Sequence, residues 1–487
     1  MTIADLRDSS AEQPTAVAAS YRWDRWRMLV LGVVLVLLAL LLKAADLISV
    51  HSLVPGVVLW LISFVPYLAG SLFMLFSRPA SGRRQRWELG LILLGAVLLR
   101  LLVLFTPPTL SGDAWRYLWD ARITLHGYSP YVYVPNDWHL IPFQDPLLYN
   151  QMGYHNVPTL YPPGAQALYL ISYMLAPDNI FVLKALFLCF DLATCVGLMV
   201  LLKRHGLDPA RSVIYAWCPL PIVEFATQGH IDSVMLAYVV WMIICAQSSW
   251  RGARVATGVL LGLATLTKLY PIVLVLVVLR RRDYALLAAC ALTIIVGYIP
   301  YVILGHGQVF GFFSTYLTQL GGNAGPLLLL IQPLGGLVHV GKDQTARLLH
   351  GITWLLLALI IVPTFLLRLR ARLSMEAATL ITLGAILSVS SFVYPWYVAS
   401  LIPWIALLLG PLWLRTTAGR RVWQARTLAL VGVWYFVCTV DVSYLFLGRT
   451  FDWTLYYILI YGVLGLCLTL AIILAIGPGR RMQIGVK

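Results

Sequence analysis

The sequence predicts an all-α polytopic membrane protein: a bundle of about 12–14 membrane helices, some of them short half-spans, with one large external loop. Of its 487 residues, 60% are hydrophobic and only 11% are charged, whereas soluble domains carry about 25% charged residues. Apolar windows of helical length recur from Arg27 to Ile476, and the mean hydropathy is +0.83. These observations exclude an ordinary soluble globular protein.

The chain is expected to form one transmembrane domain over residues 21–476. Residues 1–20 are polar and predict a disordered cytoplasmic tail, and residues 477–487 predict a second cytoplasmic tail. No small-residue cleavage site follows the first apolar run, so a cleavable signal is not indicated. The seven cysteines lie in apolar segments without a C-x-x-C pair, which indicates neither a disulfide framework nor a zinc site.

Basic residues set the expected orientation. The formal net charge is +15, and the basic residues gather beside the apolar segments, which indicates membrane orientation rather than nucleic-acid binding. The positive-inside rule places these clusters in the cytoplasm. The plasma (inner) membrane is the expected location of the protein. With the intervening segments as spans, residues 109–178 form an external loop. The turns at 227–232, 267–271 and 394–397 then face the same external side.

The segment between Arg254 and Arg280 has two interpretations. One straight helix, rising about 1.5 Å per residue, crosses a bilayer over this length, but it puts one basic cluster outside. It also buries Lys268 near mid-membrane, at a cost of about 3 kcal/mol. A hairpin of two half-spans, broken near Pro271, keeps both basic ends inside and brings Lys268 to the external face. The hairpin satisfies both constraints and is the favoured interpretation.

The external loop opens with a cluster of charged and aromatic residues from Asp113 to Arg122. Asp113 is the candidate general base, since a positioned carboxylate can take a proton from an attacking hydroxyl. Arg116 and Arg122 are candidates for binding a phosphate, and Asp120 follows Arg116 at the spacing that shares a helical face. The alternative is a surface helix of ion pairs with aromatic anchors at the membrane interface.

The external turns carry further residues that can serve the same site. His230 and Asp232 lie two apart, where the alternative roles are a hydrogen-bonded histidine and a helix N-cap. Two ligands at that spacing are not a zinc signature. Lys268 can hold a lipid phosphate as a point charge, or it can simply snorkel to the surface. Trp396 and Tyr397 can stack on a sugar ring, bracket a lipid tail or belong to an aromatic belt.

Six short motifs follow one another along the chain. They are Gly112-Asp113-x-x-Arg116-Tyr117-x-x-Asp120-x-Arg122, Gly127-x-Ser129-Pro130-Tyr131, Tyr161-Pro162-Pro163, Gly229-His230-Ile231-Asp232-Ser233, Thr267-Lys268-Leu269-Tyr270-Pro271 and Pro395-Trp396-Tyr397. Together they resemble the integral-membrane glycosyltransferases of the GT-C superfamily. The resemblance is closest to the group that includes the catalytic subunit of GPI mannosyltransferase I and the phosphatidylinositol-mannoside mannosyltransferases. The chain departs from the family's paired-acid motif, because Gly112 rather than an acid precedes Asp113.

The resemblance implies a GT-C type bundle that transfers a sugar, with inversion, from a polyprenyl-phosphate monosaccharide to a lipid or glycan acceptor. The donor sugar of the family is typically mannose, and Asp113 matches its catalytic aspartate. The candidates for binding the donor phosphate are Arg116, Arg122, His230 and Lys268. The substrate-binding candidates are Asp120, Tyr161, Asp232, Tyr270, Trp396 and Tyr397. No cofactor is expected, although a divalent cation is compatible with the site; membrane lipids are the expected surroundings.

Two other classes of function stay open from the sequence. A lipid or glycan transporter or flippase also places polar residues within the membrane, but it commonly shows inverted repeats, which are not evident here. A glycan polymerase or ligase would take a lipid-diphosphate donor instead of a monophosphate. The chemical class of the donor therefore separates a polymerase or ligase from the glycosyltransferase that uses a polyprenyl-phosphate donor.

Overall fold

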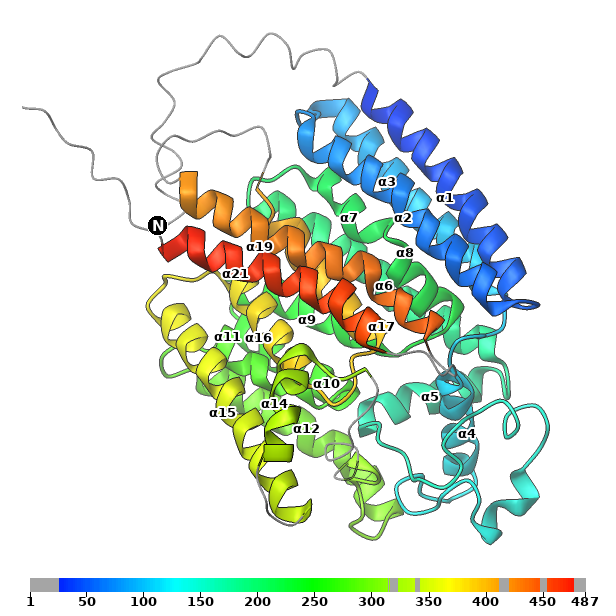
Figure 1. The fold of residues 1–487 in the computed structure, drawn as a ribbon. Helices are drawn as coiled ribbons and strands as arrows, with labels where there is room; N and C mark the ends of the chain where they lie inside the picture. The colour runs from blue at the N-terminus through cyan, green and yellow to red at the C-terminus, as the bar shows by residue number, and fades with distance from the viewer. Residues whose placement is uncertain are drawn as a thin grey trace, which may run out of the picture.

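A computed structural model describes residues 26–313, 315, 323–337, 342–410, 420–446 and 453–476. Within these residues the chain is helical and contains no β-strand, as the sequence predicts. The tails predicted at 1–20 and 477–487 lie outside the described residues. The described helices run side by side as one bundle, with connecting segments at its two ends (Figure 1).

Eight helices of the described chain are long and apolar enough to cross a membrane. They are α1 (Arg27–Ser49), α2 (Leu53–Phe76), α3 (Gly82–Leu104), α6 (Ile180–Arg204), α12 (Tyr284–Leu304), α15 (Lys342–Leu369), α19 (Arg420–Thr439) and the continuous run of α20 (Trp453–Tyr456), a π-helical turn (Tyr457–Gly462) and α21 (Val463–Ile476). Four shorter apolar helices cover Asp232–Ala246, Ala253–Thr267, Met375–Val389 and Pro395–Leu408. The predicted all-α polytopic membrane architecture is confirmed.

The first three helices form a layer along one side of the bundle (Figure 1). α1 buries a stripe that includes Leu31, Leu38 and Leu42 and exposes apolar residues on its other faces, as expected for a helix that borders lipid. α3 packs closely on the interior: a Cβ at Gly95 would stand 2.7 Å from the ring of Trp217. Glycine at this position therefore permits the close approach.

The turn predicted at 227–232 joins two short segments, and the first of them is broken by prolines. This first segment consists of α7 (Val213–Ala216), α8 (Pro219–Pro221) and a π-helical turn (Ile222–Thr227). Gly229 then adopts φ +76°, a conformation that costs glycine little. The chain returns as α9 (Asp232–Ala246). The turn that joins the two short segments is therefore buried inside the bundle.

The hairpin interpretation of the following segment is also confirmed. α10 (Ala253–Thr267) ends where Lys268 adopts an extended backbone, with φ −143° and ψ 137°. A 3₁₀ turn (Tyr270–Leu274) and α11 (Val275–Val278) lead back. Pro271 explains the break, because a proline cannot continue the preceding helix. Lys268 therefore lies at the tip of a hairpin and not within a straight helix.

The first predicted external loop packs at one end of the bundle, which we call the loop end (Figure 1). This loop contains α4 (Asp113–Leu125), a 3₁₀ turn (Trp138–Phe143) and α5 (Pro163–Leu175). α4 and α5 are joined by a parallel ring stack, in which the centroids of Tyr117 and Tyr169 lie 4.3 Å apart. The helix that begins at Asp113 is therefore fixed by packing.

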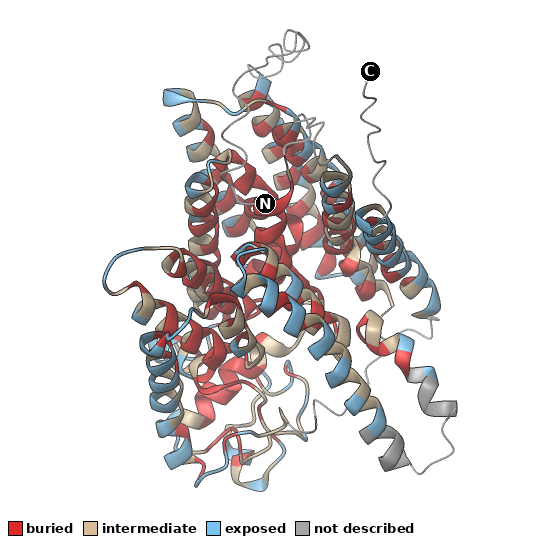
Figure 2. Ribbon diagram, turned by 90° about the vertical axis from the view of Figure 1, so that its left-hand side faces the viewer, coloured by how far each residue is buried: buried red, intermediate tan, exposed pale blue. Residues whose placement is uncertain are grey.

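At the opposite end, which we call the basic end, charged side chains form ion-pair networks. The buried Arg27 side chain has its Nε 3.1 Å from both carboxylate oxygens of Glu88 and its Nη2 2.6 Å from Asp208. Its Nη1 donates to Ser77 at 2.8 Å. Buried residues run through the middle of the bundle, and exposed positions lie on the outer helices (Figure 2).

Candidate active site

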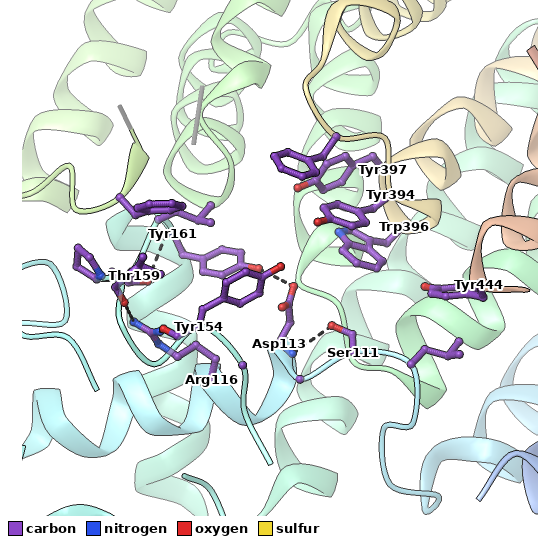
Figure 3. Close-up of a pocket in the computed structure, with 18 residues that line it drawn as sticks. Ser111, Asp113, Arg116, Tyr154, Thr159, Tyr161, Tyr394, Trp396, Tyr397 and Tyr444 are labelled. Atoms are coloured by element: carbon purple, nitrogen blue, oxygen red, sulfur yellow. Dashed lines mark hydrogen bonds between the residues drawn. The ribbon is translucent and has the colours of Figure 1, made fainter. Parts of the chain in front are cut away.

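A cavity of about 290 Å³ lies at the loop end. Its wall is formed by the start of α4, the loop 153–161 and the aromatic turn that leads into α17 (Pro395–Val398) (Figure 3). The lining residues that carry polar or aromatic chemistry include Ser111, Asp113, Arg116, Tyr154, Thr159, Tyr161, Phe392, Tyr394, Trp396, Tyr397 and Tyr444. We call this space the Asp113 cavity. Its volume is near the lower limit of small-molecule sites, about 300 Å³.

Asp113 begins α4, and its carboxylate points into the cavity (Figure 3). The hydroxyl of Tyr161 donates to Asp113 Oδ2 at 2.9 Å, and the backbone N–H of Asp113 donates to Ser111 Oγ at 3.2 Å. Burial raises the pKa of the Asp113 carboxyl, while the Tyr161 hydrogen bond and the Lys268 charge oppose this rise. A carboxylate with a raised pKa accepts a proton more readily than one in water.

Arg116 lines the cavity but is held in place by the protein. Its Nε donates to Asp120 at 2.7 Å, its Nη1 to the carbonyl of Tyr154 at 3.0 Å and its Nη2 to the carbonyl of Val157 at 3.1 Å. Asp120 does not line the cavity; it also accepts a hydrogen bond from Gln166 at 3.0 Å. The structure therefore places Asp120 as a support for Arg116 and not against the space that a substrate would fill.

Arg122 lies outside the cavity, unlike Arg116. Its guanidinium forms ion pairs with Asp145 at 2.5 Å and Asp178 at 2.6 Å, and it donates to the carbonyl of Phe143 at 2.8 Å. These contacts tie three parts of the external loop together. The structure thus gives Arg122 a loop-clamping position, and we do not assign it to the donor phosphate.

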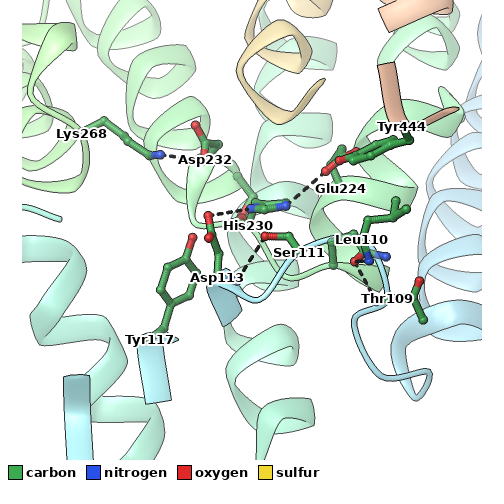
Figure 4. Close-up of polar contacts among 12 residues, drawn as sticks. Thr109, Leu110, Ser111, Asp113, Tyr117, Glu224, His230, Asp232, Lys268 and Tyr444 are labelled. Atoms are coloured by element: carbon green, nitrogen blue, oxygen red, sulfur yellow. Dashed lines mark hydrogen bonds and ion pairs between the residues drawn. The ribbon is translucent and has the colours of Figure 1, made fainter. Parts of the chain in front are cut away.

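His230 lies behind Asp113, between two carboxylates (Figure 4). Its Nδ1 is 3.8 Å from Asp113 Oδ2, and its Nε2 is 3.3 Å from Glu224 Oε2. The ring stacks on Trp396 with centroids 3.7 Å apart and planes 15° apart. Burial, and then the Lys268 charge, lower the pKa of His230 well below its ordinary value. His230 does not line the cavity, so the structure does not place it against the space that a donor phosphate would fill.

Lys268 also lies behind the cavity wall. Its Nζ is 3.2 Å from Asp232 Oδ2 (Figure 4). The ammonium lies 5.1 Å from the ring centroid of Tyr161 and 4.8 Å from that of Tyr397, which are cation–π distances. Both tyrosines line the cavity, so Lys268 supports its wall and contributes a positive potential from behind it.

The remaining predicted residues divide into two groups. Tyr161, Trp396 and Tyr397 line the cavity, as a substrate-binding role requires. Tyr270 does not: its hydroxyl lies 3.8 Å from the sulfur of Met235, inside the bundle. Its place in the motif is therefore explained by packing beneath the hairpin tip.

Sequence reasoning did not assign Tyr444 or the contacts of Glu224. The Tyr444 hydroxyl donates to Glu224 Oε1 at 2.8 Å, and Tyr444 also lines the cavity. The available sequence signal was the polar run that starts at Asp441, at the end of an apolar span. Among the residues that the structure describes, no group of three or more His, Cys, Asp or Glu side chains is placed to hold a metal ion.

Comparison with known families identifies the class of the protein. Residues 159–395 match the sequence model of glycosyltransferase family 87. The matched region starts in the cavity wall and includes the turns that carry His230 and Lys268, while Asp113 precedes it. Together with the helical bundle, this match defines a membrane glycosyltransferase. The chain is thus similar to glycosyltransferase family 87 over just under half of its length. No curated protein matches the chain.

Proposed function

We propose that the protein transfers a monosaccharide, mannose by resemblance, from a polyprenyl-phosphate donor to a lipid or glycan acceptor, with inversion. The observation that carries this proposal is the partly buried carboxylate of Asp113, which points into a cavity of sugar size at the loop end. The six resembling motifs support the donor class. The positive-inside rule supports a site on the non-cytoplasmic face of the plasma membrane.

In the proposed reaction, an acceptor hydroxyl lies beside Asp113. The carboxylate takes the hydroxyl proton while the hydroxyl oxygen bonds to C1 of the donor sugar. The bond between C1 and the phosphate oxygen breaks, and its electron pair leaves with the phosphate. Attack from the face opposite the phosphate inverts C1. Because phosphate is a good leaving group, removal of the acceptor proton matters more than protonation of the leaving group. A general base contributes about 10²- to 10⁴-fold in rate.

Arg116 is the proposed contact for the donor phosphate. Among the cavity-lining residues it supplies the positive charge, and its protein contacts hold the guanidinium in one orientation. Arginine has five N–H donors, so donors on both Nη atoms stay available for a phosphate. A cation that is fixed in advance stabilises the departing phosphate without reorganisation. Lys268 adds its charge from behind Tyr161 and Tyr397.

The aromatic turn is the proposed binding surface for the sugar and the first part of the lipid. Phe392, Tyr394 and Trp396 form a parallel stack, with successive centroids 5.8 Å and 4.5 Å apart and interplanar angles of 4° and 6°. All three residues line the cavity. A stack of rings presents an apolar wall with polar edges, which suits a sugar ring joined to an isoprenoid.

The test is a transfer assay with purified protein and radiolabelled polyprenyl-phosphate mannose, with a membrane lipid extract as acceptor and mass spectrometry of the product. We expect transfer from this donor and none from a lipid-diphosphate oligosaccharide. D113N should lower the rate at least about 100-fold. D137N should match the unmodified protein, because Asp137 contacts His139 and does not line the cavity.

Two results would contradict the proposal. An unchanged rate in D113N would remove the base, and transfer from the diphosphate donor alone would favour the polymerase or ligase alternative. Thermal unfolding of D113N in detergent, compared with D137N, separates a loss of chemistry from a loss of fold.

A further inference from the structure

A line of buried polar side chains runs inward from Asp113 (Figure 4). His230 follows Asp113, with Nδ1 3.8 Å from Oδ2. Glu224 follows His230, with Oε2 3.3 Å from Nε2. Tyr444 ends the line by donating to Glu224 Oε1 at 2.8 Å. Four groups that can carry a proton are therefore in sequence, and the two at its ends, Asp113 and Tyr444, line the cavity.

The two central members of this line are fully buried and do not line the cavity. Both ring nitrogens of His230 and Glu224 Oε2 lack a hydrogen-bond partner among the described residues. Leaving buried polar atoms unpaired costs about 1–3 kcal/mol each, so a native structure generally pairs such atoms. Here the unpaired atoms face each other and Asp113. This arrangement indicates that the hydrogen bond between His230 and Asp113 forms during the reaction rather than in the resting protein.

We propose that His230 and Glu224 form a proton relay for Asp113, which removes the acceptor proton from the cavity during sugar transfer. This inference rests on the proposed function, because it takes Asp113 as the base. Neither relay residue touches the substrate; both are positioning residues that act through Asp113.

The relay needs no charged imidazole. With Glu224 ionised, the N–H of His230 is on Nε2 and points to Glu224, so Nδ1 presents a lone pair to Asp113. An ionised carboxylate and a lone pair repel each other, which agrees with a separation of 3.8 Å, too long for a hydrogen bond. Once Asp113 has taken the acceptor proton, its O–H can donate to Nδ1. Protonated Asp113 is stabilised as it forms, and the carboxylate becomes a more effective base.

The transfer is balanced in atoms and charge. The proton on Asp113 Oδ2 moves to His230 Nδ1, and the proton on His230 Nε2 moves to Glu224 Oε2. Asp113 becomes ionised again, Glu224 becomes neutral, and His230 changes only its tautomer. After the product leaves and water fills the cavity, the same path in reverse returns the proton to Asp113 and then to water.

The surroundings of His230 favour a neutral ring in a fixed orientation. Trp396 stacks on the ring, which lies between the two carboxylates. The other ionisable groups that face this region are Asp232 on α9, Lys268 at the hairpin tip, and Asp441 and Tyr444 on the 3₁₀ turn Val440–Leu445. Lys268, already paired with Asp232, opposes a second positive charge on the ring.

The test compares two histidine–glutamate pairs in the same protein, one fully buried and one partly exposed. E224Q removes the carboxylate of the relay, and E376Q removes the carboxylate that pairs with His205 at the basic end. With polyprenyl-phosphate mannose as donor, we expect E224Q to lower kcat about 10- to 100-fold with the KM for the donor unchanged. E376Q should leave kcat and KM within about twofold, once corrected for folded protein. Unchanged kcat in E224Q, or a change in KM alone, would overturn the relay.

H230Q provides a second variant, because glutamine can hydrogen bond at this position but cannot exchange protons between two sites. We expect H230Q to lose as much kcat as E224Q, and E224Q/H230Q to lose no more than either, as for residues that act as a unit. E224D should recover part of the rate. Additive losses in the double variant would contradict a shared path.

A measurement on the unmodified protein serves if these variants fail to fold. In single-turnover transfer, the rate plotted against the fraction of D₂O should curve downward from a straight line, because more than one proton moves in the same step. A straight line would overturn the relay. The outcomes stay distinct: an active D113N removes the proposed function, whereas an inactive D113N with a fully active E224Q removes the relay alone.

Discussion

The loop end and the basic end each place a histidine beside a buried glutamate, but the two pairs differ in their contacts and in their exposure. At the basic end, His205 Nε2 lies 2.8 Å from Glu376 Oε1, and Gln247 donates to the same oxygen. At the loop end, His230 lies 3.3 Å from Glu224 and stays without a hydrogen-bond partner among the described residues. The His205–Glu376 pair is hydrogen bonded, whereas both ring nitrogens of His230 have no hydrogen-bond partner among the described residues.

The two histidines accordingly have opposite shifts in pKa. The hydrogen bond that His205 donates to the Glu376 carboxylate raises the pKa of His205. Burial, reinforced by the Lys268 charge, lowers the pKa of His230 well below its ordinary value. The same contrast separates the arginine network around Arg27 from the acids around the cavity. Closed ion pairs lie at one end, and incompletely paired groups surround the proposed active site at the other.

The largest expected effect concerns stability at the basic end. R27M leaves Glu88 and Asp208 buried without their main partner, and breaking a buried pair costs about 3–5 kcal/mol. R84M is the matched control: Arg84 is partly exposed and 3.8 Å from Glu88, so its loss costs less than about 1 kcal/mol. Denaturant unfolding in detergent measures both. Transfer activity per folded molecule should be unchanged in R27M. A loss of kcat in the folded variant would show that the basic end also affects the reaction, which contradicts this comparison.

The next effect is a shift in the pH dependence at the loop end. The base must be ionised, so kcat/KM falls as the pH drops through the raised pKa of Asp113. The Tyr161 hydrogen bond favours the ionised form; in Y161F, Asp113 therefore binds its proton at higher pH. A hydrogen bond to a charged group is worth about 1.5–3 kcal/mol, so the acidic limb should move upward by about one to two pH units. Y173F, outside the cavity, is the control. An acidic limb that stays in place, or moves downward, would contradict the role of Asp113.

A smaller effect is expected from the ring stack. W396L removes the ring that holds His230 and that also stacks on Tyr394. Such stacks contribute about 0.5–1.5 kcal/mol, so kcat should fall up to about tenfold, while W396F retains most of the rate. W138L changes an exposed tryptophan of the loop and should leave kcat unchanged. Equal losses in W396L and W396F would point to a hydrogen bond of the indole rather than to stacking.

The smallest effect is a pH-dependent stability at the basic end. The folded pKa of His205 is raised, so its contribution to stability is fully present below the unfolded pKa, about 6.5. It is lost as the pH rises through the folded pKa. H205Q should therefore reduce the free energy of unfolding by about 0.2–1 kcal/mol at low pH and by less at high pH. Thermal unfolding at several pH values checks this; a difference that grows with pH would reverse the sign and exclude the pair.

Features that depend on neighbouring residues in the chain were predictable. Hydropathy located the long spans, and the conflict between Lys268 and the flanking basic residues predicted the hairpin that ends α10. The positive-inside rule grouped Asp113, His230 and Trp396 on one side, and the structure places these three residues around one site. Each inference needed only local composition and the alternation of sides.

The arginines show a prediction that helix geometry could have refined. Arg116 and Arg122 lie six positions apart on α4, which is about 120° around a helix with 3.6 residues per turn. Both cannot face one cavity, and only Arg116 does. Arg122 reaches Asp145 and Asp178, which lie far apart in the sequence. Such a clamp depends on the tertiary path of the loop.

The position of Glu224 was not predictable from helical spacing. Glu224 and His230 are also six positions apart, but the π-helical turn and Gly229 bring their side chains together. Tyr444 arrives from a distant helix. The inner part of the site therefore depends on long-range contacts and on departures from regular helix, which helical spacing does not predict.

The central claim is that the end of the bundle with incompletely paired charges meets the lipid-borne donor on the non-cytoplasmic side. Its most direct test is thiol labelling of S111C, beside Asp113, and of R251C, at an exposed turn of the basic end. Right-side-out and inverted membrane vesicles are treated with a membrane-impermeant reagent, with the unmodified protein as the blank for native cysteines. We predict that S111C is labelled only in right-side-out vesicles and is protected by polyprenyl-phosphate mannose, while R251C is labelled only in inverted ones. Labelling of both cysteines from one side, or no protection of S111C by the donor, would contradict the account.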